Sequence, residues 1–423
     1  MKADCFPDYK MRFVLENPPF GQAWGGKDAA EGVEAAVKDE YAKGFDGRWG
    51  AGLPGTGDMQ MLFLQSAVNK MDDQLGRCAI IENGSPLFTG GTASGESQIR
   101  RWLLENDLIE AIIALPTDLF YNTGIATYIW ILSKNKRQER KGKVQLIDAS
   151  KICHPLRKSL GNKRNEISPE DRRVITRLYA DFKEGEEVRI FANTEFIYRE
   201  YAVMQPLQRR YEITVESIDR LLQKGSLNSL YDEGKVMVLQ AKQEKDELSA
   251  KEARQLAKFL QNQPLYQKIM DTLRANINDQ TYPHPRYFMP VLTAALADVT
   301  TDKKLLEKIA DGLSIMDKTA EIQKDKKGNT IYDKETKDTE IVKWGKTIDD
   351  YMAREVLPFV PDAKAFFEED LSKKKPVIKT GAEIPFTRYF YKYQQPEASE
   401  KLAQEFMDLE KSVNERIQKL FRK

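Results

Sequence analysis

The first 150 residues alternate between short apolar runs and stretches in which apolar side chains recur every three or four positions. The apolar runs predict β-strands at residues 13–15, 78–81, 111–115 and 126–132, with an additional edge strand at 144–147. The helical spacing predicts helices at residues 58–71 and 98–104. Because alternating strands and helices are typical of an α/β fold, we expect a mostly parallel sheet covered on both faces.

The middle of the chain has a different pattern. Residues 168–182 are amphipathic and begin with a Ser-Pro pair, which predicts a capped helix. From residue 236 to 380 the chain is highly charged, and Ser249 and Glu252 form a capping-box pattern before an apolar run. We therefore expect a mainly helical region here, but the sequence indicates no chemistry for it.

The last part of the chain, residues 397–421, carries an apolar stripe flanked by Glu and Lys. The residues of the stripe recur at steps of three and four: Leu402, Phe406, Leu409, Val413, Ile417 and Leu420. This spacing predicts an amphipathic helix. On the pattern alone, such a stripe more often packs against its own chain than against a partner.

Opposite charges nearly cancel over the chain, with 66 Lys and Arg residues, 65 Asp and Glu residues and a formal net charge of +1. A protein that grips DNA alone usually has a basic excess, because phosphate neutralisation supplies much of the affinity. The balance therefore favours a subunit that shares its DNA contacts. One local exception, residues 134–164, is strongly basic: Lys134, Lys136, Arg137, Arg140, Lys141, Lys143, Lys151, Arg157, Lys158, Lys163 and Arg164. This run is either a solvated loop or an edge that contacts phosphates.

Several classes of protein do not fit the composition. The 3 cysteines are widely separated without C-x-x-C spacing, and there are only 2 histidines. This pattern argues against a disulfide framework, a metal site and a Ser-His-Asp hydrolase. The chain also lacks an apolar signal segment and any apolar stretch near the ~20 residues of a membrane helix. We expect a cytoplasmic protein.

The most informative motif is Asn17-Pro18-Pro19-Phe20, which follows the first predicted strand. The amide oxygen of Asn17 and the carbonyl oxygen of Pro18 can each accept one hydrogen from an amino group on an aromatic base, which directs the nitrogen lone pair toward an incoming methyl group. The fixed φ of the two prolines stiffens the turn. Phe20 can stack on a base that has left the duplex. These residue types predict a site for a flipped-out adenine, and the alternative is an ordinary strand-to-turn junction.

Three further segments follow in order: GLPGTGDMQMLFLQ at 52–65, a segment at 83–133 that begins NGSPLFTGG, and EIPFTRYFYKY at 383–393. With these segments the chain resembles the modification (methyltransferase) subunits of type I restriction-modification systems over most of its length apart from residues 232–340. The resemblance implies an adenine-specific DNA methyltransferase. Such an enzyme transfers a methyl group from S-adenosylmethionine to the exocyclic amino group of adenine in DNA.

The resemblance also implies roles and partners. Asn17 and Pro18 would accept hydrogen bonds from the target amino group, Pro19 would shape the turn and Phe20 would stack on the base. The implied partners are DNA, a specificity subunit and a restriction subunit. Similar subunits dock on the specificity subunit through C-terminal helices, which favours that role for residues 397–421.

Four regions are predicted from the pattern and the resemblance together. Residues 1–150 would be the C-terminal part of the adenine methyltransferase catalytic domain, and residues 151–235 a connecting α/β segment. Residues 236–382 would be a charged, mainly helical accessory insertion, and residues 383–423 a C-terminal helical tail for partner docking. The predicted fold class is α/β: part of a Rossmann-like methyltransferase sheet without its N-terminal strands, followed by a mainly helical C-terminal region.

The residues that bind the cofactor are unknown. In similar subunits a Gly-rich turn precedes the Asn-Pro-Pro-Phe strand, whereas here only a dozen residues precede that strand. The downstream candidate, Phe88-Thr89-Gly90-Gly91, lacks the preceding acidic residue and fits a structural turn, or a wall near the target base, better than a cofactor loop. We expect this chain to be the C-terminal portion of a modification subunit whose upstream half is a separate polypeptide or is lost.

Two other functions fit part of the sequence. The chain could be a catalytically silent assembly module that keeps the partner-binding tail. It could also methylate protein glutamine, since such enzymes carry a similar Asn-Pro-Pro-Tyr motif. Phe20, the long insertion and the segment at 383–393 count against the glutamine methyltransferase.

The absence of the Gly-rich turn leads to a testable prediction. We expect the isolated chain to bind S-adenosylmethionine weakly or not at all, because half of the usual pocket is missing. Isothermal titration calorimetry measures this directly, and micromolar affinity would contradict the expectation.

Overall fold

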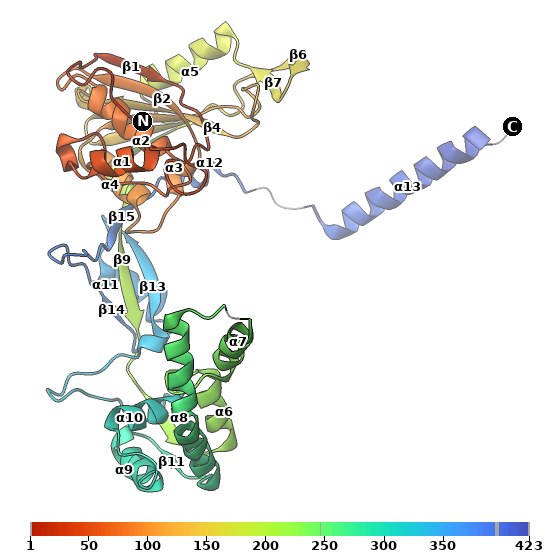
Figure 1. Cartoon of the computed structure of the whole chain (residues 1–423). Helices are drawn as coiled ribbons and strands as arrows, with labels where there is room; N and C mark the ends of the chain where they lie inside the picture. The colour runs from red at the N-terminus through yellow and green to blue at the C-terminus, as the bar shows by residue number, and fades with distance from the viewer. Residues whose placement is uncertain (1, 246, 394–396, 422–423) are drawn as a thin grey trace. The chain divides into compact units, whose positions relative to one another are not determined.

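The computed structural model describes residues 2–245, 247–393 and 397–421 and divides into two compact units (Figure 1). The first unit contains Met1–Arg199, Lys343–Gly345 and Glu369–Lys423, and the second contains Glu200–Val342 and Lys346–Glu368. The first unit therefore continues well beyond residue 150, where the sequence pattern suggested a boundary. The reason is that a strand and a helix beyond that point complete the sheet and its cover.

A six-stranded sheet with the order β1-β2-β4-β3-β5-β8 organises the first unit. Its strands are β1 (Phe13–Glu16), β2 (Arg77–Asn83), β3 (Ile109–Ala114), β4 (Thr127–Ser133), β5 (Lys143–Asp148) and β8 (Val188–Ala192). All of the predicted strands of the first 150 residues are present. β1 runs parallel to β2 and β3 parallel to β5, whereas β4 is antiparallel to both neighbours and β8 is antiparallel to β5.

The α/β fold class is confirmed, but two details of the predicted sheet were wrong. The sheet is mixed and not mostly parallel, because residues 115–126 join β3 to β4 without a helix, so the chain turns back beside the strand it has just left. The strand predicted at 144–147 is not an edge strand, because β8 pairs with the outer side of β5. The sequence did not reveal β8, which has only five residues and carries a charged residue, Arg189, at its second position.

Helices cover both faces of this sheet, as predicted. They are α1 (Val33–Tyr41), α2 (Gln60–Lys70), α3 (Ser85–Phe88), α4 (Gly95–Glu105) and α5 (Pro169–Asp181). On one face, Leu64 of α2 and Ile99 of α4 are buried in a cluster that includes Trp130 of the sheet. On the other face, Ile175 of α5 packs in a second cluster with Ile113. The helix predicted at 168–182 is α5, and Ser168 and Asp171 form a complete capping box at its start.

Segments from the end of the chain complete the first unit. β15 (Thr380–Ala382) pairs with the beginning of β9 (Ile197–Met204), and α12 (Phe386–Phe390) follows it. Phe386 is buried in the same cluster as Trp130. The EIPF part of the segment predicted from the resemblance therefore belongs to the core of the first unit and not to a separate tail.

Arg100 on α4 holds this returning segment in place. Its side chain is fully buried and donates hydrogen bonds to the carbonyl oxygens of Ala382 at 2.7 Å, Thr89 at 2.9 Å and Pro86 at 3.1 Å. Burial lowers the pKa of Arg100 to about 10, so the guanidinium stays charged at neutral pH. One cation thus ties α4 to two stretches of backbone, 86–89 and the segment at Ala382, which is 282 positions away in the sequence.

The second unit has a helical core. Its helices are α6 (Val215–Gln223), α7 (Glu233–Glu244), α8 (Ala250–Ala275), α9 (Pro285–Ala295), α10 (Lys303–Leu313) and α11 (Ile348–Tyr351). Ile218, Leu273, Phe288 and Leu313, from four of these helices, are buried in one cluster. The capping box expected before the α8 run is present at Ser249. This unit extends from residue 200 to 368, whereas the predicted insertion began at 236 and ended at 382.

Short strands also belong to the second unit, although the sequence pattern there indicated mainly helices. A three-stranded sheet has the order β11-β10-β12, formed by β10 (Arg209–Glu212), β11 (Thr281–Tyr282) and β12 (Ile315–Met316). The remaining strands include β13 (Asp338–Lys343) and β14 (Lys364–Phe366), and β14 pairs with the end of β9. β11, β12 and β14 have only two or three residues, which is too short to show an alternating pattern in the sequence.

The predicted C-terminal helix is present as α13 (Ser399–Phe421). The six residues of its predicted stripe are between 45% and 79% exposed, so the stripe faces solvent in this chain. Among the helices of the described residues, none combines the length and the apolar character that a membrane span requires.

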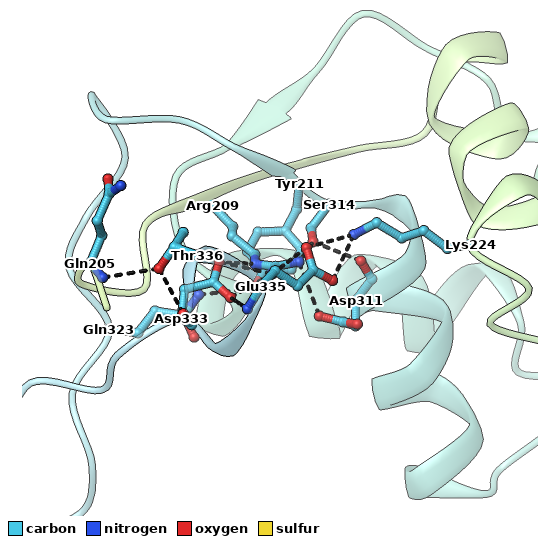
Figure 2. Close-up of polar contacts among 10 residues, drawn as sticks. All are labelled: Gln205, Arg209, Tyr211, Lys224, Asp311, Ser314, Gln323, Asp333, Glu335 and Thr336. Atoms are coloured by element: carbon cyan, nitrogen blue, oxygen red, sulfur yellow. Dashed lines mark hydrogen bonds and ion pairs between the residues drawn. The ribbon is translucent and has the colours of Figure 1, made fainter. Parts of the chain in front are cut away.

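A network of ionised side chains around Arg209 fastens the start of β10 (Figure 2). Arg209 makes a bidentate contact with Asp333, with Nη2 2.9 Å from Oδ1 and Nε 3.1 Å from Oδ2. Its guanidinium also lies 2.7 Å from Glu335 Oε2 and 3.1 Å from Ser314 Oγ. Only 4% of the Arg209 side chain and 5% of the Asp333 side chain are exposed, so water screens this pair weakly.

This network leads to a prediction about stability. Replacing Arg209 by Ala leaves the buried Asp333 carboxylate without its cation, so we expect the free energy of unfolding to fall by about 3–5 kcal/mol. Arg210→Ala is the matched control, because the neighbouring side chain is 39% exposed and its ion pairs should contribute less than about 1 kcal/mol. Denaturant titration followed by circular dichroism measures both variants, and equal losses would show that the buried pair has no special role.

Candidate functional site

The candidate site lies where β1 ends at the carboxyl edge of the sheet. β1 pairs in parallel with β2, with Glu16 opposite Ile80, so the residues that follow both strands emerge on the same edge. Ligands of open α/β sheets bind at this edge. Asn17 and Pro19 are exposed, Pro18 is buried and Phe20 is half-buried.

The polar groups of the motif have no partners within the part of the chain that the structure describes. There, neither the side-chain amide of Asn17 nor the carbonyl oxygen of Pro18 forms a hydrogen bond. Because Asn17 is exposed, its amide can reach a ligand without first breaking an internal bond. The φ of 66° at Gly21, a left-handed value that favours glycine, turns the chain away directly after the motif.

Phe20 is braced by a second aromatic ring. Its centroid lies 6.3 Å from that of Phe120, with the two ring planes at 84°, which is an edge-to-face contact. Phe120 lies in the loop 115–126 that follows β3, so two loops at the same edge of the sheet meet here. The sequence pattern did not predict this contact, although Phe120 lies inside the 83–133 segment that supported the resemblance.

The chain that follows the motif is tied to the segment at 52–65. The backbone N–H of Trp24 donates to the carbonyl oxygen of Thr56 at 2.9 Å, and that of Met59 donates to Gln22 at 3.0 Å. The buried indole of Trp24 also donates to the carbonyl oxygen of Gly55 at 3.1 Å. Two of the segments that resemble the family therefore lie side by side, although the sequence alone did not show that they meet.

A polar network lies at the start of α2 and the end of β2. Gln60 accepts a hydrogen bond from the Asn83 backbone at 2.7 Å and donates to Asp58 at 2.6 Å. Ser85 donates its hydroxyl hydrogen to the Asn83 side chain at 2.7 Å. Sequence reasoning did not single out these residues. The sequence feature that could have pointed to them is the group of polar residues within the segments 52–65 and 83–133.

Glu82 is the group that sequence reasoning missed most clearly. It is fully buried on β2, and neither carboxyl oxygen has a hydrogen-bond partner among the described residues. Burial, and secondarily the charges of Asp58 and Glu16, raise the pKa of Glu82 well above its ordinary value. The sequence could have revealed it, because Glu82 follows Cys78 and Ile80 at every second position, so all three side chains point to the same buried face of the strand.

The glycine-rich segment after α3 has the geometry of a packed turn. Gly90 has a φ of 92°, and a Cβ atom there would lie 2.0 Å from Ser94 Oγ. The carbonyl oxygen of Thr89 accepts a hydrogen bond from Arg100 at 2.9 Å. The turn therefore fits the cap of α4 and leaves no space for a ligand against Gly90. A cavity of about 490 Å³ lies elsewhere, at the opposite ends of the strands, beside Lys10, Asn69 and Lys134.

Comparison with known proteins identifies the class to which this fold and motif belong. A family model described as N-6 DNA Methylase matches residues 1–219. This match covers more than half of the 423 residues, and the chain belongs to the N-6 DNA methylase family.

Curated relatives narrow the comparison to type I restriction enzymes. The MjaVIII methylase subunit of Methanocaldococcus jannaschii is 35% identical over 40% of this chain and 27% of its own length. The HindI methylase subunit of Haemophilus influenzae is 32% identical over 34% of this chain and 29% of its own length. The resemblance to modification subunits is therefore confirmed, while the matched part spans less than a third of these relatives.

The comparisons with known proteins also include a solved structure. The methyltransferase subunit of a type I restriction-modification system from Streptococcus thermophilus aligns with 44% of this chain and 36% of its own, at 24% identity and a TM-score of 0.36.

The unusual state of Glu82 leads to a prediction about pH. A carboxyl that is neutral when buried but ionises in the unfolded chain makes the folded state less stable as the pH rises above the ordinary pKa, by about 1.4 kcal/mol per pH unit until the raised pKa is reached. We therefore expect Glu82→Gln to be more stable than the natural protein at pH 8, with the difference shrinking as the pH falls toward 5. Denaturant titrations at both pH values measure this, and a pH-independent difference would show that Glu82 is ionised in the fold.

Proposed function

We propose that this chain holds the target adenine in a DNA methyltransferase of a type I restriction-modification system. The observation that carries the proposal is the pair of acceptors, Asn17 and Pro18, that follow a strand at the carboxyl edge of the sheet without internal partners. Membership of the N-6 DNA methylase family supports it, because that family name describes methylation at an exocyclic amino nitrogen.

The chemistry of the target base explains why these groups suit it. The lone pair of an aromatic amine is delocalised into the ring, so the nitrogen is a poor nucleophile. Two acceptors, one on each amino hydrogen, favour a tetrahedral nitrogen with its lone pair directed outward. Phe20, braced by Phe120, would stack on the extruded base and offset an unstacking cost of a few kcal/mol.

The methyl donor implied by the family is S-adenosylmethionine, which would supply an electrophilic methyl group. The glycine-rich turn at Gly90 does not fit it, because Ser94 fills the space beside that residue. The proposal therefore concerns only the binding and orientation of the base. No general base is required, since a sulfonium donor is already activated and positioning supplies much of the catalysis.

Two surfaces support the proposed partners. The exposed apolar stripe of α13, whose residues are up to 79% exposed, would pack on a helix of a specificity subunit, as in the partner docking implied by the resemblance.

β1 is at the edge of the sheet, and its Phe13 and Leu15 are 64% and 80% exposed. An upstream polypeptide would pair with this free strand edge and pack against these side chains. DNA and a restriction subunit complete the proposed assembly.

Replacing Asn17 tests the proposal directly. In the chain reconstituted with its partner polypeptides, Asn17→Ala should lower the rate of methyl transfer to DNA about 100-fold or more, because one acceptor of the amino group is lost. Transfer of a radiolabelled methyl group to a DNA duplex is the measurement.

Asn135→Ala is the matched control. Asn135 is also an exposed residue that follows a strand of the same sheet, but β4 runs antiparallel, so Asn135 lies at the opposite edge. Its replacement should leave the rate unchanged. Full activity of Asn17→Ala in an assembled complex would remove the assignment of the motif.

A further inference from the structure

A basic hairpin projects from the first unit beyond the sheet (Figure 1). It consists of β6 (His154–Leu160) and β7 (Lys163–Glu166), which pair antiparallel. It carries four cations within eight residues: Arg157, Lys158, Lys163 and Arg164. Arg157, Lys158 and Arg164 are exposed and Lys163 is half-buried. The strongly basic run of the sequence is therefore, in this part, an ordered two-stranded ribbon and not an irregular loop.

The charges of this ribbon are not compensated. None of its four cations forms an ion pair with any residue that the structure describes, although acidic residues are almost as numerous as basic ones in the chain as a whole. Glu166 is the acidic residue of the two strands, and it lies at the base of the hairpin, opposite His154. Four like charges held together repel one another, so the arrangement is most favourable when a polyanion lies against it.

The tip of the hairpin rests on the loop that follows β3. Gly161, at the turn, has a φ of 63°, and a Cβ atom there would lie 2.8 Å from the carbonyl oxygen of Tyr121. The backbone N–H of Asn162 donates to the same oxygen at 3.0 Å. The Lys163 ammonium lies 5.2 Å from the centre of the Tyr121 ring, within the range of a cation–π contact.

Further along β7 the contacts with this loop continue. The backbone N–H of Arg164 donates to the carbonyl oxygen of Asp118 at 2.9 Å, and the Asn165 side chain donates to Thr117 at 3.0 Å. The same loop contains Phe120, which contacts Phe20 of the candidate site. The ribbon and the target-base motif therefore both contact one short loop.

From this geometry we propose that the β6–β7 hairpin grips the phosphate backbone of the DNA duplex that carries the target base. The proposal rests on the function proposed above. A seven-residue strand spans about 20 Å, and a two-stranded ribbon of this kind fits the major groove or lies along its edge. Arg and Lys side chains on such a ribbon reach phosphates on both sides. The nearly neutral chain would thus concentrate its DNA-binding charge beside the site where a base must be extracted.

The dependence of binding on salt provides the test. Each phosphate contact adds about 0.9 to the slope of log affinity against log salt concentration. We expect the variant with Arg157, Lys158, Lys163 and Arg164 all replaced by Gln to bind a fluorescein-labelled DNA duplex more weakly and with a slope smaller by about 2–4. The full chain with its partner polypeptides is titrated by fluorescence anisotropy between about 50 and 200 mM salt, which spans the range where such contacts matter.

A matched control carries the same change of charge elsewhere. Lys303, Lys304, Lys326 and Lys327 are exposed residues of the second unit, and replacing all four by Gln should leave the slope unchanged. An equal loss in the control would show that only total charge matters and would overturn the proposal. So would an unchanged slope in the hairpin variant, or competition by polyglutamate as strong as that by unlabelled DNA, since an acidic protein would then be the better partner.

Asn17→Ala separates this proposal from the proposed function. It should abolish methyl transfer and leave the salt slope unchanged, whereas the hairpin variant should lose affinity and recover methyl transfer at saturating DNA. If Asn17→Ala retains methyl transfer while the hairpin variant loses its salt dependence, the DNA contact stands and the assignment of the motif falls.

Discussion

The parallel pairing of β1 with β2 is the constraint on which the candidate site depends. Its register places Val14 opposite Cys78, and Val14 is 6% exposed whereas Leu15 is 80% exposed. A slip of one residue would move every side chain of β1 to the other face of the sheet. Leu15 would then be buried, and the residues that follow β1 would point in a different direction. The proline pair then limits the path of the chain after the strand. Strand register and proline geometry together determine where the acceptors of Asn17 and Pro18 emerge.

Around this strand, the first unit brings distant parts of the sequence to one edge. The loop after β3 contacts the motif through Phe120 and contacts the basic hairpin through Tyr121, so base binding and backbone binding would share a support. Arg100 fastens the returning C-terminal segment to α4 of the same unit. These links use backbone carbonyl groups and an edge-to-face contact between two half-buried rings, so the edge should be rigid enough to hold a substrate in one orientation.

The sequence predicted most strands of the six-stranded sheet well, because β-branched and aromatic runs such as that around Trp130 are hard to accommodate elsewhere. It failed on strand direction and on the edge position of the strand at 144–147, since a run of apolar residues does not indicate which neighbour it will pair with. The misplaced boundary at residue 150 has the same cause. β8, at 188–192, joins the sheet beside β5, and nothing in its own sequence distinguishes it from a connecting segment.

The sequence by itself determined five of the six strands of the sheet, the capped starts of α5 and α8 and the four-residue motif, because each depends on interactions between residues close together in the chain. Only the tertiary structure decided that Phe20 meets Phe120, that Glu82 is buried without a partner, and that Arg209 pairs with Asp333. These features depend on residues separated by many positions in the sequence. Their energies come from the removal of side chains from water when distant parts of the chain pack together. Such energies depend on which surfaces the whole chain brings together, and no local pattern encodes that.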